Sequence, residues 1–283
     1  MNHIFKRVVV VLNQMDNIDN LLEKAVNFSN QHKTTLEVLF VYEEPLFKLP
    51  DYFLSYAKKS QDALYEHRIK DKIKDKLKEL TVSKEVIISV LIGNTLKQVK
   101  DYGKYNTDIL FITSYHKSLD TKLLHETPHS FWIVKNSNKS YKEILLPIDL
   151  KTKSREVITA TQHIFPTAKI GVVHDYRFTL DNSLMEGNHL HITPIVSGID
   201  RGMHIEQKKR QQELFEDCKS NFNVTGDFLE EKRGLEEDLI EYIHFSNAEL
   251  IVMYPEEIEL FFSSDLIIEL LHNVSKDFLV LNI

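Results

Sequence analysis

The stretch Tyr141–Leu150 reads YKEILLPIDL, and it repeats the plan of Phe5–Gln14, which reads FKRVVVVLNQ. In both, an aromatic residue and a lysine lead into a short aliphatic run, which ends near Asn13 in one and Asp149 in the other. A short continuous aliphatic run is typical of a strand buried on both faces of a parallel sheet. The two starts are 136 residues apart, about one domain length. The chain therefore begins the same kind of fold twice.

The order of the elements that follow is also repeated. Gly93 and Gly234 are separated by 141 residues, and so are Asn106 and Asn247, which open the segments NTDILFIT and NAELIVMY. Strands that alternate with helices predict crossover units and a mainly parallel sheet. We therefore predict an α/β protein of two tandem doubly wound domains, each a five-stranded mostly parallel sheet with helices on both faces.

The predicted domains cover residues 1–135 and 141–283, joined by a short polar linker at 136–140. The predicted strands of the first domain are Val8–Leu12, Leu36–Val41, Val86–Leu91, Ile109–Thr113 and Phe131–Val134. Those of the second are Ile144–Ile148, Ile170–His174, Asn223–Leu229, Leu250–Tyr254 and Phe278–Asn282. A long helix is predicted from about Leu54 to Leu80, because its apolar residues follow a helical period.

Composition limits the classes of function. The 283 residues carry a net charge of −7, which argues against nucleic acid as a partner, since phosphate binding needs concentrated Lys and Arg. No apolar run approaches the ~20 residues of a membrane span, so we expect no membrane association. The single cysteine, Cys218, indicates a reducing compartment, and we expect a cytoplasmic protein. The chain has 8 glycines, too few to favour a glycine-rich phosphate cradle.

Several stretches carry a resemblance to a known family. They are KRVVVVLN and KEILLPID at the domain starts, IGNTLKQVKDYGKYNTDILFIT and KRGLEEDLIEYIHFSNAELIVMY in the middles, and ETPHSFWIV, with Pro128, before the last strand of the first half. Their order resembles the universal stress protein family in its tandem two-domain form. The resemblance implies a stress-linked binding or regulatory role without catalysis. It also implies an intrachain pseudo-dimer through Phe131–Val134 and Phe278–Asn282, and leaves open a homodimer of the full chain.

One branch of that family binds ATP through an Asp after strand one, a backbone contact at the end of strand two and a G-x2-G-x9-G-[ST] loop after strand four. Here Asn13 replaces the Asp in the first half, and SYHKSLDTKLLHET, before Pro128, has no glycine. The second half keeps Asp149 and offers Val173 at strand two, but its loop YPEEIELFFSSD lacks glycine and is acidic. The resemblance therefore implies the branch that does not bind ATP through this loop, and no cofactor is expected.

The candidate ligand-binding residues lie in the second half. Asp149 follows the first strand, at the edge where doubly wound folds bind ligands, although it would serve equally as a helix cap. Val173 is its predicted backbone neighbour. Ser263 and Ser264 precede a predicted helix, where they would cap it or bind a small anion.

A metal site is a further alternative in the second half. His189 and His191 are two residues apart, and His174 and His204 flank the same irregular stretch. Imidazole is a common zinc ligand, so these histidines are candidates, with surface or core histidines as the alternative.

We predict a non-catalytic binding or scaffold protein, because no G-x-S-x-G, H-E-x-x-H or Walker motif is present. The alternative is an adenine-nucleotide sensor that binds ATP or AMP at one degenerate site around Asp149 and Val173. A weak hydrolase, or a metal enzyme that uses the histidines, is a third hypothesis.

Overall fold

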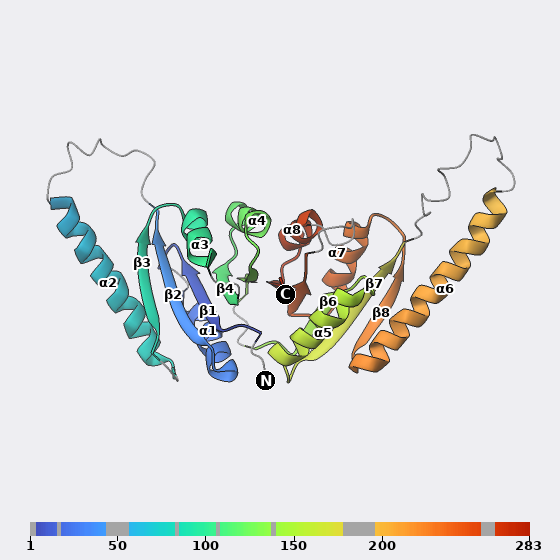
Figure 1. Cartoon of the computed structure of the whole chain (residues 1–283), viewed down its shortest axis with the longest axis horizontal. Coiled ribbons are helices and arrows are strands. Elements are labelled where there is room, and N and C mark those ends of the chain that lie inside the picture. Colours follow the sequence, from blue (N-terminus) through green and yellow to red (C-terminus); the bar gives the residue numbers. More distant parts are fainter. Residues whose placement is uncertain are drawn as a thin grey trace. The chain divides into compact units, whose positions relative to one another are not determined.

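The structure is a computed structural model that describes residues 4–15, 18–43, 57–82, 85–105, 108–136, 140–177, 196–255 and 264–283. Within them strands and helices alternate, except where two strands follow one another between the two halves of the chain (Figure 1). The strands are β1 (Arg7–Leu12), β2 (Thr35–Tyr42), β3 (Ile87–Ile92), β4 (Ile109–Ser114), β5 (Ser130–Val134), β6 (Glu143–Pro147), β7 (Lys169–Tyr176), β8 (Thr225–Glu230), β9 (Leu250–Met253) and β10 (Asp277–Val280). The helices are α1 (Ile18–His32), α2 (Ala57–Glu79), α3 (Thr95–Gly103), α4 (Lys117–Glu126), α5 (Thr152–Ile164), α6 (Val196–Phe222), α7 (Leu235–Phe245) and α8 (Ser264–Asn273).

The chain divides into two compact units, and the division does not follow the sequence repeat. The first unit is Met1–Tyr141 together with Glu249–Ile283, and the second is Lys142–Ala248. The first unit therefore holds all of the first half and also β9, α8 and β10 from the end of the chain. The domain boundaries that the repeat predicts, 1–135 and 141–283, remain a prediction about the duplicated sequence.

The sheet of the first unit has the strand order β3-β2-β1-β4-β5-β10-β9. The five strands of the first half are parallel throughout, and β10 is parallel to β9 but antiparallel to β5. Val8 of β1 pairs with Leu36 of β2 and with Leu110 of β4, so the central strand lies between two apolar neighbours. This burial on both faces explains the uninterrupted valine run, and it confirms the predicted α/β class with a mostly parallel sheet.

Helices cover this sheet on both sides. Leu22 and Ala25 of α1 are fully buried, and α1 packs against β1, β2 and β4. Ile73 of α2 is also fully buried, and α2 packs on the edge strand β3. In Figure 1, α3 and α4 lie on the side of the strands opposite α2. These layers leave the carboxyl ends of β1, β2 and β4 next to the starts of α3 and α4.

The second unit is built on the parallel order β6-β7-β8. Helix α6 lies along β7 and β8, and α7 lies on the other side of β7 (Figure 1). Gly226 allows β8 to approach β7, since a Cβ at this position would lie only 1.9 Å from the Val172 carbonyl oxygen. No other residue type fits there without a backbone shift.

The pairing of β5 with β10 joins the two ends of the first unit. Phe278, Leu279 and Val280 pair with Ile133, Trp132 and Phe131 in antiparallel register. These are the two strands that the sequence predicted to associate.

Buried polar groups hold the chain at this junction. The Tyr141 hydroxyl donates to Asp277 and accepts from Lys24 Nζ at 2.9 Å and from Trp132 Nε1 at 3.1 Å. The backbone N–H groups of Lys135 and Asn136 both donate to Asp277 Oδ1, each at 2.8 Å. Because unpaired charges are costly to bury, this network favours one register of the two strands.

Within the described residues, no helix is long and apolar enough to span a bilayer.

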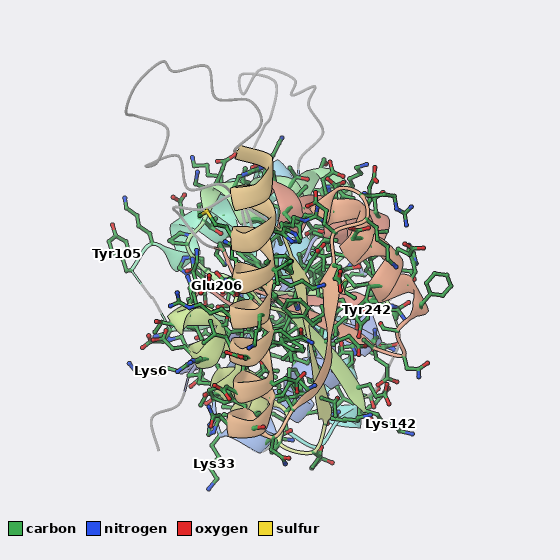
Figure 2. The ribbon with its side chains drawn as sticks, turned by 90° about the vertical axis from the view of Figure 1, so that its right-hand side faces the viewer. Lys6, Lys33, Tyr105, Lys142, Glu206 and Tyr242 are labelled. Carbon is green, nitrogen blue, oxygen red and sulfur yellow. The ribbon has the colours of Figure 1, made fainter. Side chains whose placement is uncertain are left out.

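Two aromatic side chains at helix ends are exposed to solvent. Tyr105, after α3, and Phe245, the last residue of α7, are each 84% exposed. Figure 2 shows Tyr105 projecting away from the ribbon. Single exposed aromatics are ordinary on a protein surface and mark no site by themselves.

Candidate functional site

Asp149 lies directly after β6, as predicted, and its side chain is 4% exposed. Its Oδ1 accepts the N–H of Lys151 at 3.0 Å and the hydroxyl proton of the fully buried Ser154. The bond to the residue two positions on forms an Asx turn. In this turn Leu150 adopts a left-handed backbone conformation, with φ 66°, which is unfavourable for residues other than glycine. Asp149 thus stabilises the turn at the start of α5 through hydrogen bonds with neighbouring residues of the chain.

Val173 lies in the interior of the sheet rather than at the end of its strand. The predicted strand Ile170–His174 ends two residues early, because β7 continues to Tyr176 and pairs with β8 over its last residues. The Val173 carbonyl accepts the N–H of Ile148 at 2.8 Å, so its backbone oxygen already has a partner. The longer strand places Asp175 and Arg177, not Val173, at the carboxyl end of β7.

His174 is a core histidine in this structure. Its Nδ1–H donates to the Ile148 carbonyl at 2.8 Å, and its ring lies 5.5 Å from Phe228 and 6.4 Å from Phe215, centroid to centroid. Burial lowers the pKa of His174, which favours the neutral ring, although the Ile148 carbonyl and Asp149 act in the opposite direction.

The other predicted metal ligands do not join it in the part of the chain that is described. His189 and His191 lie outside the described residues. His204 stacks edge-on against Tyr176, with ring centroids 5.6 Å apart. Among the described residues no three His, Cys, Asp or Glu side chains gather as a metal site.

Ser263 also lies outside the described residues, and Ser264 is the first residue of α8. The prediction placed both serines before the helix, whereas Ser264 is part of it. This position does not decide between capping and anion binding.

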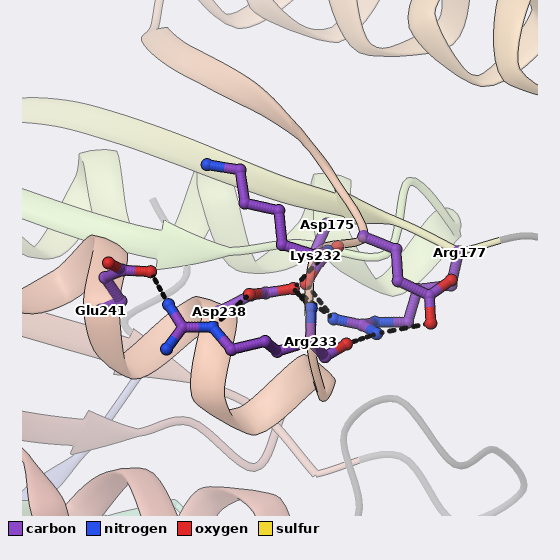
Figure 3. A network of polar contacts seen from close by, with 7 residues as sticks. Asp175, Arg177, Lys232, Arg233, Asp238 and Glu241 are labelled. Atoms are coloured by element: carbon purple, nitrogen blue, oxygen red, sulfur yellow. Dashed lines mark hydrogen bonds and ion pairs between the residues drawn. The ribbon is translucent and has the colours of Figure 1, made fainter.

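An ion network that the sequence analysis missed forms around Arg177 (Figure 3). The guanidinium is 12% exposed and pairs with Asp175 Oδ2 at 2.6 Å and with Asp238 Oδ2 at 3.0 Å. Its Nη1 also donates to the Arg233 carbonyl at 2.7 Å. In the sequence, only the Asp-Tyr-Arg stretch at the end of β7 indicates this network. The other carboxylate, Asp238, lies 61 residues away from Arg177.

The pKa values of the two carboxylates in this network are shifted in opposite directions. Burial raises the pKa of Asp175, and Arg177 offsets part of this effect. Burial also acts to raise the pKa of Asp238, but N–H donation from Lys232 and Arg233, together with Arg177, holds it below its usual value. The network ties the end of β7 to the first turn of α7, and its internal pairing is typical of a structural ion cluster.

A cavity of about 170 Å³ lies at the carboxyl ends of β1 and β4 in the first half. Asn13, Gln14 and His116 line it together with the hydroxyl-bearing residues Thr95, Thr113, Ser114 and Tyr115, and its apolar lining is Val11, Leu12, Ile18, Leu21 and Leu119. The site predictions favoured the second half, whereas this cavity lies beside Asn13. In the part of the chain that the structure describes, its lining contains no Lys, Arg, Asp or Glu.

The connection from β4 to α4 is only two residues long, Tyr115 and His116. His116 is the N-cap of α4, and its Nδ1 accepts the N–H of Leu119 at 3.4 Å. In turn, the His116 N–H donates to Asp120 Oδ2 at 2.6 Å. Burial raises the pKa of Asp120 to about 7, against the effects of that N–H and of Lys135. The helix start is thus capped by the chain itself.

The start of α3 is capped in the same way. Glu43 Oε1 accepts the N–H of Thr95 at 2.9 Å, and Asn94 Oδ1 accepts the N–H of Lys97 at 3.1 Å. Hydrogen bonding from Thr95 holds the pKa of Glu43 below its usual value. Phosphates bind at helix starts through free N–H groups, and here Glu43 would repel them. The residues next to this cavity therefore do not fit a triphosphate.

Comparison with known proteins supports the fold. No protein-family model and no curated protein matches this chain in sequence. The solved structures that it resembles include a protein assigned as a universal stress protein from Pseudomonas aeruginosa UCBPP-PA14, with a TM-score of 0.64 and 14% identity over 99% of this chain and 95% of that one. Another is a universal stress protein from Archaeoglobus fulgidus DSM 4304, with a TM-score of 0.63 and 11% identity over 98% and 97% of the two chains. The chain therefore has the fold of the universal stress proteins along nearly its whole length.

Proposed function

We propose that this protein is a stress-linked binding or regulatory protein without catalysis, and that it does not bind ATP through a glycine loop. The observation that carries the proposal is the two-residue connection between β4 and α4. A phosphate cradle needs a loop whose free backbone N–H groups face the ligand. Tyr115 and His116 leave no such loop, and side chains already accept the nearby N–H groups at both helix starts.

The alternative is a nucleotide sensor with one site around Asp149 and Val173. Asp149 is already engaged by Lys151 and Ser154, and the Val173 carbonyl is bonded within the sheet. A nucleotide would have to compete with the turn that Asp149 forms. This makes the alternative the less favoured of the two.

The proposal includes the pairing of the two halves within one chain, as the resemblance implies. Its support is the antiparallel register of β5 and β10 and the buried network of Tyr141, Asp277 and Lys24. In this proposal β5 and β10 cover each other's apolar edges, which are otherwise prone to association.

Isothermal titration of the full chain with ATP and with AMP, each in the presence of Mg²⁺, tests the proposal. We expect no binding heat for either nucleotide. Micromolar affinity would contradict the proposal. If that affinity were then lost in Asp149→Ala, the nucleotide-sensor alternative would replace it. A matched titration of Asn13→Ala, at the equivalent strand end of the first half, shows which half is responsible.

A further inference from the structure

The cavity beside Asn13 has a buried polar group in its lining. Thr113, near the end of β4, is 2% exposed, and its hydroxyl has no hydrogen-bond partner among the described residues. Leaving a buried hydroxyl unpaired costs about 1–3 kcal/mol, so such groups normally have a partner. Because Thr113 lines the cavity, a molecule inside it can supply that partner.

The size of the cavity limits what it holds. Its volume of about 170 Å³ is well above the ~10–15 Å³ that one water needs. It is below the ~300 Å³ at which pockets for drug-sized ligands begin. A molecule of a few carbons fits this range, and a nucleotide does not.

The electrostatics of the cavity limit the charge of the ligand. Among the described residues, the lining has no Lys or Arg to pair an anion and no Asp or Glu to pair a cation. The helix starts that could attract an anion are capped, α3 by Glu43 and α4 by His116. An anion taken from water into this cavity would lose hydration and meet the Glu43 carboxylate that is bonded to Thr95, and a cation would find no carboxylate in the described lining, so charged ligands are disfavoured.

The polar lining groups share one chemical property. Hydroxyls and side-chain amides each donate and accept hydrogen bonds, and here they come from Asn13 and Gln14, which follow β1, and from Thr113 and Ser114 at the end of β4. Val11, Leu12 and Leu119 add apolar lining. Neighbouring hydroxyls on a short carbon chain match this mixed lining, because they pair with its polar groups while their C–H groups contact its apolar residues.

We infer that this cavity binds a short uncharged polyol, with the Thr113 hydroxyl as the buried hydrogen-bonding partner of one of its hydroxyls. The inference rests on the proposed binding function and specifies the class of ligand.

The test is a titration of the full chain with glycerol and with erythritol, followed by amide chemical shifts in NMR spectra. We expect shifts that saturate and cluster at Asn13, Thr113 and Ser114. Inorganic phosphate and AMP should leave the same amides unshifted. Thr113→Val keeps the shape of the side chain and removes its hydroxyl, and it should weaken polyol binding roughly fivefold, as for one lost hydrogen bond.

Thr34→Val is the matched control. Thr34 is buried, and its hydroxyl also has no partner among the described residues, but it lies outside the cavity lining. It should bind polyols like the unmodified chain. If Thr113→Val does not fold, the clustering of shifts in the unmodified chain still tests the site.

Three outcomes would overturn the inference. They are the absence of saturable polyol shifts in the unmodified chain, equal polyol affinity in Thr113→Val, and shifts that cluster away from the cavity. With no nucleotide binding in the titrations above, these outcomes leave the proposed function intact. Binding of AMP at the cavity amides would instead contradict both.

Discussion

The turns that directly follow β2 and β7, called corners below, occupy equivalent positions in the two halves. The first residue of each corner carries the opposite charge to that of the other. Both strands have eight residues and end in a tyrosine, Tyr42 in one and Tyr176 in the other. The next residue is Glu43 in the first corner and Arg177 in the second. Glu43 accepts an N–H at the start of α3, whereas Arg177 pairs with Asp238 in the first turn of α7.

The reversed charge changes the role of the corner. Helix α7 carries its own acidic residues in its first turn, and one of them, the buried Asp238, pairs with the cation at the strand end. Helix α3 has no acidic residue there and receives a carboxylate from the strand instead. Arg177 is largely buried and joins two buried carboxylates, while Glu43 is exposed. The second corner is therefore the structural one.

Replacing Arg177 should have the largest effect. Arg177→Met leaves Asp175 and Asp238 buried without their cation, and we expect a loss of about 3–5 kcal/mol in the free energy of unfolding. Chemical denaturation of the full chain, followed by circular dichroism, measures it. Arg233→Met is the control, because this side chain is 52% exposed and its ion pairs should contribute at most ~1 kcal/mol. Equal losses in the two variants would show that burial does not distinguish them.

The next largest difference in unfolding free energy is expected between variants of Asp149 and Asn13, which follow the first strand of each half. Asp149→Ala removes the Asx turn and a partner of Ser154, and we expect it to cost about 1–2 kcal/mol. Asn13→Ala alters an exposed side chain and should stay within ~0.5 kcal/mol. The same denaturation experiment compares them. A larger loss in Asn13→Ala would reverse the roles assigned to the two halves.

Glu43 should show the smallest effect, and one that depends on pH. Glu43→Gln weakens the cap of α3, and we expect a loss of about 0.5–1 kcal/mol at neutral pH. Because the folded pKa of Glu43 lies below the usual value of 4.5, its contribution is present above that pH and disappears as the pH falls through the folded pKa. The two proteins should therefore converge in acid.

Unfolding free energies measured at neutral pH and below pH 4.5 check this convergence. Glu85→Gln serves as the control, since Glu85 is also exposed and precedes the edge strand β3. A difference between Glu43→Gln and the unmodified chain that stays constant with pH would contradict the capping role.

Much of the fold could be predicted from local patterns. The valine run of β1 and the aliphatic run of β6 have one stable environment, the middle of a covered sheet, so they identify the central strands. The prediction failed at the end of β7, where Asp175 and Tyr176 continue the strand. A polar residue after an aliphatic run normally indicates a turn, but here Arg177 neutralises Asp175 and the strand extends.

The sequence by itself determined the α/β class and the place of Asp149 after a strand, and it predicts the duplication, because periodicity and chain order are local properties. Only the tertiary structure decided what surrounds each strand end. It assigned β9, α8 and β10 to the first compact unit, since a β5–β10 pair joins residues far apart in the chain. It also brought Arg177 to Asp238 and left Thr113 facing a cavity. Contacts of this kind depend on how the elements pack, and no local pattern encodes them.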